Sequence, residues 1–159
     1  MSRESKEELI DAVGLAVREA QAAVDEMDEA ACKALGINRT DGRCLDVIHR
    51  EEPVTPGYLA QRSGLTTAAV TTVLDRMEAA GYVIRTRDTD DRRRVLVRLT
   101  PLAHKRAAEI WGPFSDFRTE LSGYTVEELK LLRDFHRRAR DYNERAAAKT
   151  RGLNYGESA

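Results

Sequence analysis

A run of charge between two apolar runs constrains the fold of this 159-residue chain most strongly. The segment 88–94 reads Asp-Thr-Asp-Asp-Arg-Arg-Arg, and it lies between the runs 82–85 and 95–99, which are rich in β-branched residues. Two such runs on either side of a polar tip predict two short antiparallel strands. The sequence therefore predicts a hairpin with a charged, solvent-facing tip.

Two short helices joined by a tight turn are predicted just before this hairpin. Thr55 is a good N-cap, and Pro56 suits the first helical position because its missing N–H is no loss there. Gly64 can end this helix in the left-handed conformation, Thr66 caps the next helix, and Gly81 closes it. The pair is typical of a helix-turn-helix. A helix-turn-helix followed by strand, basic tip and strand is a much rarer order than either part alone, and it predicts a winged helix.

Long apolar stripes with helical spacing lie at both ends of the chain. The first covers 5–34 and ends at Gly36, and the second follows a capping box at 125–128. Such terminal helices cannot all be buried on the small winged domain between them. Two-fold pairing of subunits would bury them, although ordinary core packing stays an alternative for the first helix. Pairing would also set two recognition helices about 34 Å apart, the spacing of neighbouring major grooves.

Two further helices complete the expected architecture. One covers about 40–51 and is capped by Asn38 or Thr40; the other begins at Pro101 and runs to Phe117, with a break or kink at Gly112-Pro113. The expected fold class is mainly α with a small antiparallel β wing, an α+β arrangement. We expect an N-terminal dimerisation helix over 1–36, a winged helix-turn-helix domain over 37–100, C-terminal dimerisation helices over 101–150 and a disordered tail over 151–159.

Composition and charge distribution narrow the class of protein. Hydrophobic residues make up 42% and charged residues 33%, which suits a soluble helix-rich protein. No apolar run approaches the roughly 18 residues of a membrane helix, and residues 1–8 are too polar for a signal peptide. The net charge is −1, yet 85–98 holds six arginines against three aspartates, whereas 4–29 is strongly acidic. Positive charge is thus concentrated around the hairpin, as a nucleic-acid surface requires.

The sequence shows no motif of catalysis or metal binding. No nucleophile–base pair, phosphate loop or paired carboxylates stands out, so we expect neither an enzyme nor a cofactor. The histidines His49, His104 and His136 are scattered, so no metal site is expected. Cys32 and Cys44 lack metal-ligand spacing. Cys32 is the redox candidate, which leaves open an oxidant-sensing regulator.

The order of these parts resembles the MarR family, the multiple-antibiotic-resistance type of bacterial regulator. The resemblance runs from residue 5 to about 148 and rests on 59–65, 70–78, 81–83 and above all the D-x-D-D-R-R-R…V-x-L-T wing. It implies an obligate homodimer with intertwined terminal helices, a double-stranded, pseudo-palindromic DNA operator, usually repression, and release by a small, often phenolic effector. We therefore expect a cytoplasmic protein, nucleoid-associated when bound to DNA, with no membrane partner.

One polar face of the expected recognition helix is the candidate groove-reading surface. It lies opposite the apolar face of Val70, Leu74 and Met77. Threonine hydroxyls can bond bases or phosphates there, and their methyls can contact thymine. The candidate DNA contacts on this helix are Thr66, Thr67, Ala68, Thr71, Thr72, Asp75 and Arg76.

Position 72 departs from the family pattern. Relatives often carry arginine where this chain has Thr72, so the helix lacks a long bidentate reader of guanine. Arg76 is expected either to reach a phosphate or to pair with an acid that braces the wing. Thr55, Gln61 and Arg62, on the first helix of the pair, are candidate contacts to the DNA backbone, which position the protein without specifying sequence.

The resemblance to the MarR family implies a role for each arginine of the tip. Arg93 is expected to enter the minor groove, where negative potential is strongest, and Arg92 and Arg94 to contact flanking phosphates. Asp91 is expected to shape the tip by pairing with an arginine. The alternatives are a flexible charged turn without a partner and a winged helix that binds protein, but three consecutive arginines favour DNA.

The resemblance also implies an effector pocket between the dimer helices and the winged domain. Each candidate fits a core or interface role as well, and the Gly112-Pro113 break could widen or shift the pocket. The candidates are Arg18, Met27, His49, Trp111 and Phe114, with Phe117 and Tyr142 beside them.

Overall fold

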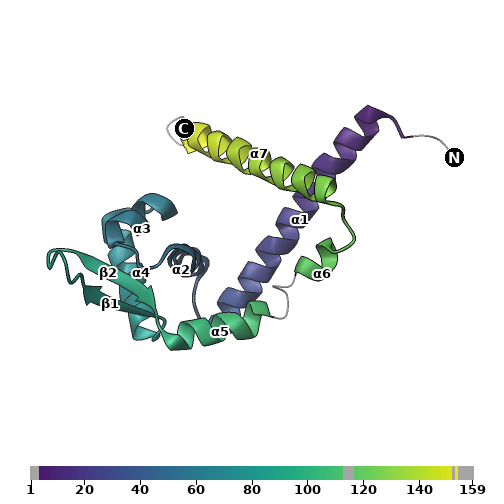
Figure 1. Cartoon of the computed structure of the whole chain (residues 1–159). Coiled ribbons are helices and arrows are strands. Elements are labelled where there is room, and N and C mark those ends of the chain that lie inside the picture. Colours follow the sequence, from purple (N-terminus) through teal and green to yellow (C-terminus); the bar gives the residue numbers. More distant parts are fainter. Residues whose placement is uncertain (1–3, 113–116, 152, 154–159) are drawn as a thin grey trace. The chain divides into compact units, whose positions relative to one another are not determined.

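The computed structural model describes residues 4–112, 117–151 and 153 and divides the chain into two compact units, Met1–Pro113 and Phe114–Ala159. Figure 1 labels their helices and strands, which confirm the predicted fold class. The first unit contains α1 (Lys6–Leu35), α2 (Arg39–Glu51), α3 (Pro56–Ser63), α4 (Thr67–Ala79), β1 (Val83–Arg87), β2 (Val95–Leu99) and α5 (Pro101–Trp111). The second unit contains α6 (Phe117–Leu121) and α7 (Val126–Arg151).

Side-chain caps set the beginnings of the helices in the first unit. The side chains of Asn38, Thr55, Thr66 and Thr100 each accept the backbone N–H of the third residue along, at the start of α2, α3, α4 and α5. Asn38 rather than Thr40 is therefore the cap of α2. Gly64 ends α3 with a φ of 70°, a left-handed conformation that glycine adopts without the steric cost of a Cβ. These caps fix the tight turn between α3 and α4.

The wing is an antiparallel hairpin that is longer than predicted. Its ladder continues beyond Arg85, because Thr86 pairs with Leu96 and Arg87 with Val95. A bridge outside the hairpin joins Val54 to Val97, with N···O distances of 3.1 and 2.8 Å. This bridge fastens the segment between α2 and α3, which includes a cis Glu52–Pro53 peptide, to the middle of strand β2.

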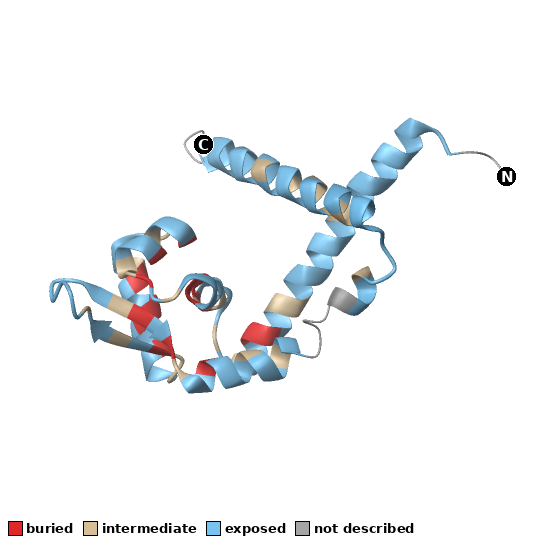
Figure 2. Ribbon diagram, in the orientation of Figure 1, coloured by how far each residue is buried: buried red, intermediate tan, exposed pale blue. Residues whose placement is uncertain are grey.

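The hydrophobic core of the first unit lies where α2, α3, α4 and α5 meet the two strands (Figure 2). The largest fully buried side chains are Ile48, Leu59, Leu74, Met77, Val70, Val97 and Cys44. Because three of these lie on α4, the core fixes the rotation of that helix about its axis and turns its opposite face to solvent.

The two longest helices bury little of their own surface. In α1 only Ala31 and Cys32 are buried, and α7 has no buried residue. Helix α5 ends at Trp111, just before the predicted break, and Pro113 lies outside the described residues. Among the described residues, no helix combines the length and the apolar character needed to cross a membrane.

Candidate nucleic-acid interface

Helix α4 turns one face to the core and the opposite face to solvent. Val70, Val73, Leu74 and Met77 are buried. An exposed helical face is what the major groove of DNA, about 12 Å wide, admits. The exposed face holds the predicted groove contacts Thr66, Thr67, Ala68, Thr71, Thr72, Asp75 and Arg76.

Two threonines of this face are hydrogen-bonded to their own helix. The Thr71 hydroxyl donates to the Thr67 carbonyl oxygen at 3.1 Å, and the Thr72 hydroxyl donates to that of Ala68 at 3.2 Å. A hydroxyl has a single proton, so each side chain retains only a methyl group and acceptor lone pairs for another partner. Thr66 differs, because its oxygen accepts a backbone N–H as the N-cap and its proton stays available.

Arg85 of β1 fastens the wing to α4. Its guanidinium donates to Glu78 Oε2 from Nη2 at 2.7 Å and from Nε at 3.0 Å, and Nη2 also donates to Asp75. These bonds hold the pKa of the Glu78 carboxyl below its ordinary value of 4.5. The sequence predicts Asp75 as a groove contact, whereas its carboxylate is paired with Arg85 here. Sequence reasoning missed Arg85 and Glu78, since the partner of a strand arginine depends on the tertiary fold.

Arg76 joins α4 to α2 and not to the wing. Its Nη2 lies 2.6 Å and its Nε 3.3 Å from the two carboxylate oxygens of Asp41. Only 3% of Asp41 is exposed, whereas about half of the Arg76 side chain is. The pair raises the pKa of Arg76, chiefly through the hydrogen bond to Asp41. The expectation that Arg76 pairs with an acid to brace the wing is therefore corrected: the acid is on α2, which sequence spacing did not reveal.

The aspartates of the wing tip shape its turn. The Asp88 N–H donates to the Arg94 carbonyl at 3.0 Å, and the side chains of the same two residues form an ion pair at 3.6 Å. The Asp91 carboxylate accepts the Arg93 N–H at 3.0 Å. The sequence predicts that Asp91 pairs with an arginine side chain, but the residue that does so is Asp88, which lies across the turn from Arg94. Arg92 and Arg93 are exposed and form no ion pair with any described residue, so the tip presents two guanidinium groups without an ion-pair partner.

The predicted backbone contacts Gln61 and Arg62 lie on α3, and Thr55 is its N-cap. Thr55 Oγ1 accepts the Tyr58 N–H at 3.2 Å as the cap of the helix. Arg62 Nε lies 3.5 Å from Glu51 Oε1, and the Tyr58 hydroxyl donates to the same carboxylate, which raises the pKa of Tyr58. Gln61 is exposed and makes no side-chain hydrogen bond within the described part of the chain, so its amide is available to another molecule.

The predicted effector-pocket residues lie on several elements. Arg18 and Met27 are on α1, His49 is on α2, and Trp111, 37% exposed, ends α5. The His49 ring centroid lies 5.9 Å from that of His104 on α5. Phe114 and the side chain of Phe117 lie outside the described residues, and Tyr142 is an exposed residue of α7, in the second unit. The effector pocket stays a prediction.

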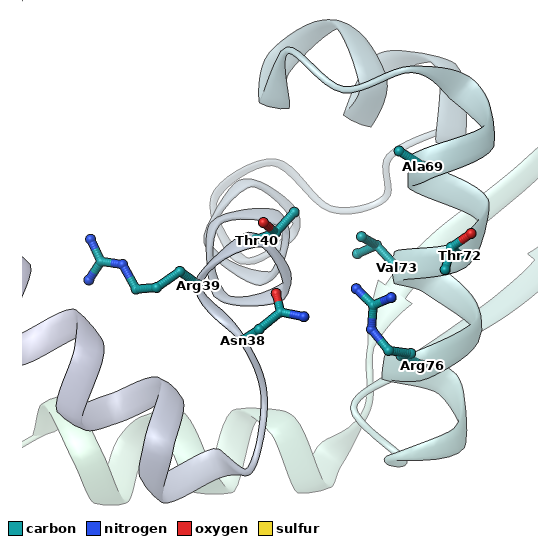
Figure 3. A pocket seen from close by; sticks show the side chains of 7 residues that line it. All are labelled: Asn38, Arg39, Thr40, Ala69, Thr72, Val73 and Arg76. Carbon is teal, nitrogen blue, oxygen red and sulfur yellow. The ribbon is translucent and has the colours of Figure 1, made fainter.

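A groove of about 580 Å³ lies between α2 and α4 (Figure 3). The Asn38 amide and the Arg76 guanidinium face each other across it, whereas Arg39 points away. The lining residues are Asn38, Arg39, Thr40, Ala69, Thr72, Val73 and Arg76, none of them a predicted effector contact.

Both cysteines are buried thiols. Burial raises the pKa of Cys32 and of Cys44. A redox sensor needs the opposite, a lowered pKa and solvent access, so the geometry argues against oxidant sensing through Cys32. Among the residues that the structure describes, no three His, Cys, Asp or Glu side chains are grouped to hold a metal ion.

A helix-turn-helix with an exposed recognition face, followed by a hairpin with two exposed, unpaired arginines at its tip, defines a winged-helix DNA-binding protein. The model of the MarR family matches residues 35–94. YcgE, an uncharacterized HTH-type transcriptional regulator of Bacillus subtilis strain 168, is 38% identical over 117 residues, or 73% of this chain and 76% of YcgE. The chain belongs to the MarR family of transcriptional regulators, and it is a regulator and not an enzyme.

Other relatives and solved structures extend the comparison. The HTH-type transcriptional repressor YetL of Bacillus subtilis is 31% identical over 94 residues, 56% of each chain. FabT of Streptococcus pneumoniae, solved in complex with DNA, has a TM-score of 0.64 at 20% identity and covers 89% of this chain and 99% of its own. NadR, solved with 4-hydroxyphenylacetate, has a TM-score of 0.58 at 23% identity and covers 87% and 97%. The two structures share the fold of this chain.

Proposed function

We propose that the protein binds a pseudo-palindromic DNA operator as a homodimer. Each subunit would place α4 in a major groove and the 88–94 tip in a neighbouring minor groove. The observation that carries the proposal is the pair of exposed guanidinium groups at the tip, those of Arg92 and Arg93, which have no ion-pair partner within the described chain. A narrow minor groove has enhanced negative potential that attracts such groups. The complex of FabT with DNA supports this reading.

The exposed apolar residues of the long helices support the homodimer. Monomeric proteins seldom leave large contiguous apolar surfaces in water, and two-fold pairing is the commonest way to cover them. On α7 the exposed large apolar residues are Val126, Leu131 and Tyr142, and no residue of that helix is buried. On α1 the corresponding residues are Leu9, Ile10, Val13, Leu15 and Val24.

We further propose that the protein acts in the cytoplasm as a repressor that a small aromatic molecule releases from DNA. YetL, which is named a transcriptional repressor, supports the repressor role. The complex of NadR with 4-hydroxyphenylacetate supports the response to a small aromatic molecule. Release follows if the ligand binds better to a state that cannot place both tips on DNA, because a ligand shifts an equilibrium only through such a difference. Displacement of the protein from its operator by a panel of small phenolic acids tests this part.

Salt-dependent binding of an Arg93→Ala variant tests the DNA assignment. The operator is first enriched from random duplex DNA with the full-length protein. Each neutralised phosphate contributes about 0.9 to the slope of log affinity against log salt, so losing one arginine per subunit flattens the slope by up to about two. The matched control is Arg145→Ala, which removes an exposed arginine of α7 that has no ion pair among the described residues.

The outcomes separate the parts of the proposal. We expect Arg93→Ala to lower operator affinity and the slope, and the Arg145→Ala control to change neither. Equal affinity and slope for Arg93→Ala and the wild type would contradict the wing assignment. If no palindrome is enriched, a winged helix that binds protein is favoured instead. A monomer mass in light scattering at micromolar concentration would overturn the dimer.

A further inference from the structure

We infer that the middle turn of α4 reads thymine methyl and adenine amino groups, and not guanine edges, so that operator half-sites centre on A·T pairs. The inference rests on the proposed function and deepens it by naming the sequence class that α4 prefers. It follows from the donors, acceptors and methyl groups that remain on the exposed side chains once their hydrogen bonds within the protein are counted.

The hydroxyl protons of the middle turn are already used. Thr71 and Thr72 donate them to carbonyl oxygens of their own helix, at 3.1 and 3.2 Å. Guanine presents only acceptors, N7 and O6, in the major groove. A guanine opposite these threonines would therefore find a donor only at the cost of an intrahelical hydrogen bond.

The long cations near this face are held by other parts of the protein. Arg76 is bound to the buried Asp41 of α2, so turning Arg76 toward DNA would leave a buried carboxylate without an ion-pair partner. Arg85 is bound to Asp75 and Glu78 of α4 itself. Neither guanidinium is available as the bidentate donor that guanine recognition commonly uses.

An A·T pair complements what remains. Adenine N6 supplies a donor that the threonine lone pairs can accept, and the thymine C5-methyl can pack on the methyl groups of Ala68, Thr71 and Thr72. A G·C pair offers the cytosine N4 donor but no methyl group. Thr66 retains its hydroxyl proton, but it is the N-cap of α4 and lies before the middle turn to which the inference applies. The A·T pair is thus the one that offers both a hydrogen-bond donor to the threonine lone pairs and a methyl group to the methyl groups of the middle turn.

Modified bases in the enriched operator test this inference with the full-length protein. Replacing thymine by deoxyuridine removes only the methyl group, and burial of one methylene-sized group is worth about a fourfold change in affinity. We expect deoxyuridine at the α4-facing thymines to weaken binding by about fourfold per contacted methyl. Replacing guanine by 7-deazaguanine removes the N7 acceptor, and we expect it to change affinity by less than about twofold.

Two variants of Thr72 and one control distinguish the contribution of the methyl groups to binding from that of the hydroxyls. Thr72→Val keeps a methyl group and loses the lone pairs, so its sensitivity to deoxyuridine should persist. Thr150→Val is the matched control, because the Thr150 hydroxyl donates to the Ala146 carbonyl at 2.9 Å in the same way on an exposed position of α7. Thr72→Arg supplies the missing long donor, so an operator enriched again with this variant should gain guanines whose replacement by 7-deazaguanine weakens binding.

The outcomes distinguish this inference from the function on which it rests. Unchanged binding with deoxyuridine, together with a tenfold loss with 7-deazaguanine, would overturn the base preference while operator binding itself stands. Deoxyuridine sensitivity that disappears in Thr72→Val would likewise contradict the methyl contacts. Absence of binding to every duplex would overturn the proposed function, and the base preference with it.

Discussion

Replacement of Arg85 by alanine should loosen the wing from the recognition helix. The guanidinium holds Glu78 at 2.7 and 3.0 Å and also binds Asp75, so one cation serves two acids. The arginine side chain is 25% exposed, but those of Asp75 and Glu78 are 60% and 42% exposed, and solvent screens much of the attraction. We therefore expect a loss of about 1 kcal/mol in the free energy of unfolding, the upper end for exposed pairs. That loss lowers Tm by about 2–4 °C in a chain of this size.

The larger effect of Arg85→Ala is expected on DNA binding. Without the guanidinium, the Asp75 and Glu78 carboxylates stay unpaired on α4, and each subunit adds one net negative charge near the DNA. A unit charge about 7 Å from a phosphate in water contributes about 0.6 kcal/mol. Two phosphates near each of two subunits bring the loss to about 2.4 kcal/mol, or about sixtyfold in affinity.

Thermal unfolding and fluorescence anisotropy on the same samples measure the two effects separately. The matched control is Arg106→Ala, which breaks an exposed pair with Glu109 within α5 at 2.8 Å. Adding Asp75→Asn and Glu78→Gln to Arg85→Ala should recover most of the affinity, because the unpaired charges are then gone. Wild-type Tm and affinity for Arg85→Ala would refute the clamp, and failure of the triple variant to recover would refute the charge argument.

Three other predictions concern packing, pH and thiol chemistry. Gly42→Ala should lower Tm, because its Cβ would lie 2.5 Å from Cys32 Sγ, and the same change in a Cys32→Ala background should stabilise by about 0.5–1 kcal/mol through helix propensity. The stability that Arg85 gives through Glu78, whose pKa it lowers, should be full above pH 4.5 and shrink as the pH falls through the folded pKa; an unfolding difference that is constant down to pH 3 would contradict this. Cys32 and Cys44 should label with maleimide at pH 7 more slowly than free cysteine, and rapid labelling in mass spectrometry would show that these thiols are accessible.

Features that depend on neighbouring residues were predictable from the sequence. Thr55, Thr66 and Thr100 act as caps because a cap contacts the backbone three residues away, and a proline or an apolar staple marks the place. The alternation of runs around 88–94 gave the hairpin for the same reason. Local chemistry therefore located most of the winged domain.

Features that join distant segments were not predictable. The Val54–Val97 bridge links positions more than forty residues apart in a segment too short to show strand periodicity. The Arg76–Asp41 pair spans 35 residues, and an acid buried on α2 looks like any other helical aspartate in the sequence. At the tip, charge alone did not distinguish Asp88 from Asp91 as the partner of an arginine, because the turn geometry decides it.

Hydroxyl-radical footprinting of the enriched operator can show directly whether a dimer grips the minor groove, because the radicals attack the DNA backbone from that groove. We expect two protected minor-groove stretches related by the two-fold axis of the operator, and both should weaken together in Arg93→Ala. A single protected stretch, or two stretches that Arg93→Ala leaves unchanged, would contradict a dimer that grips the minor groove through the tip of its wing.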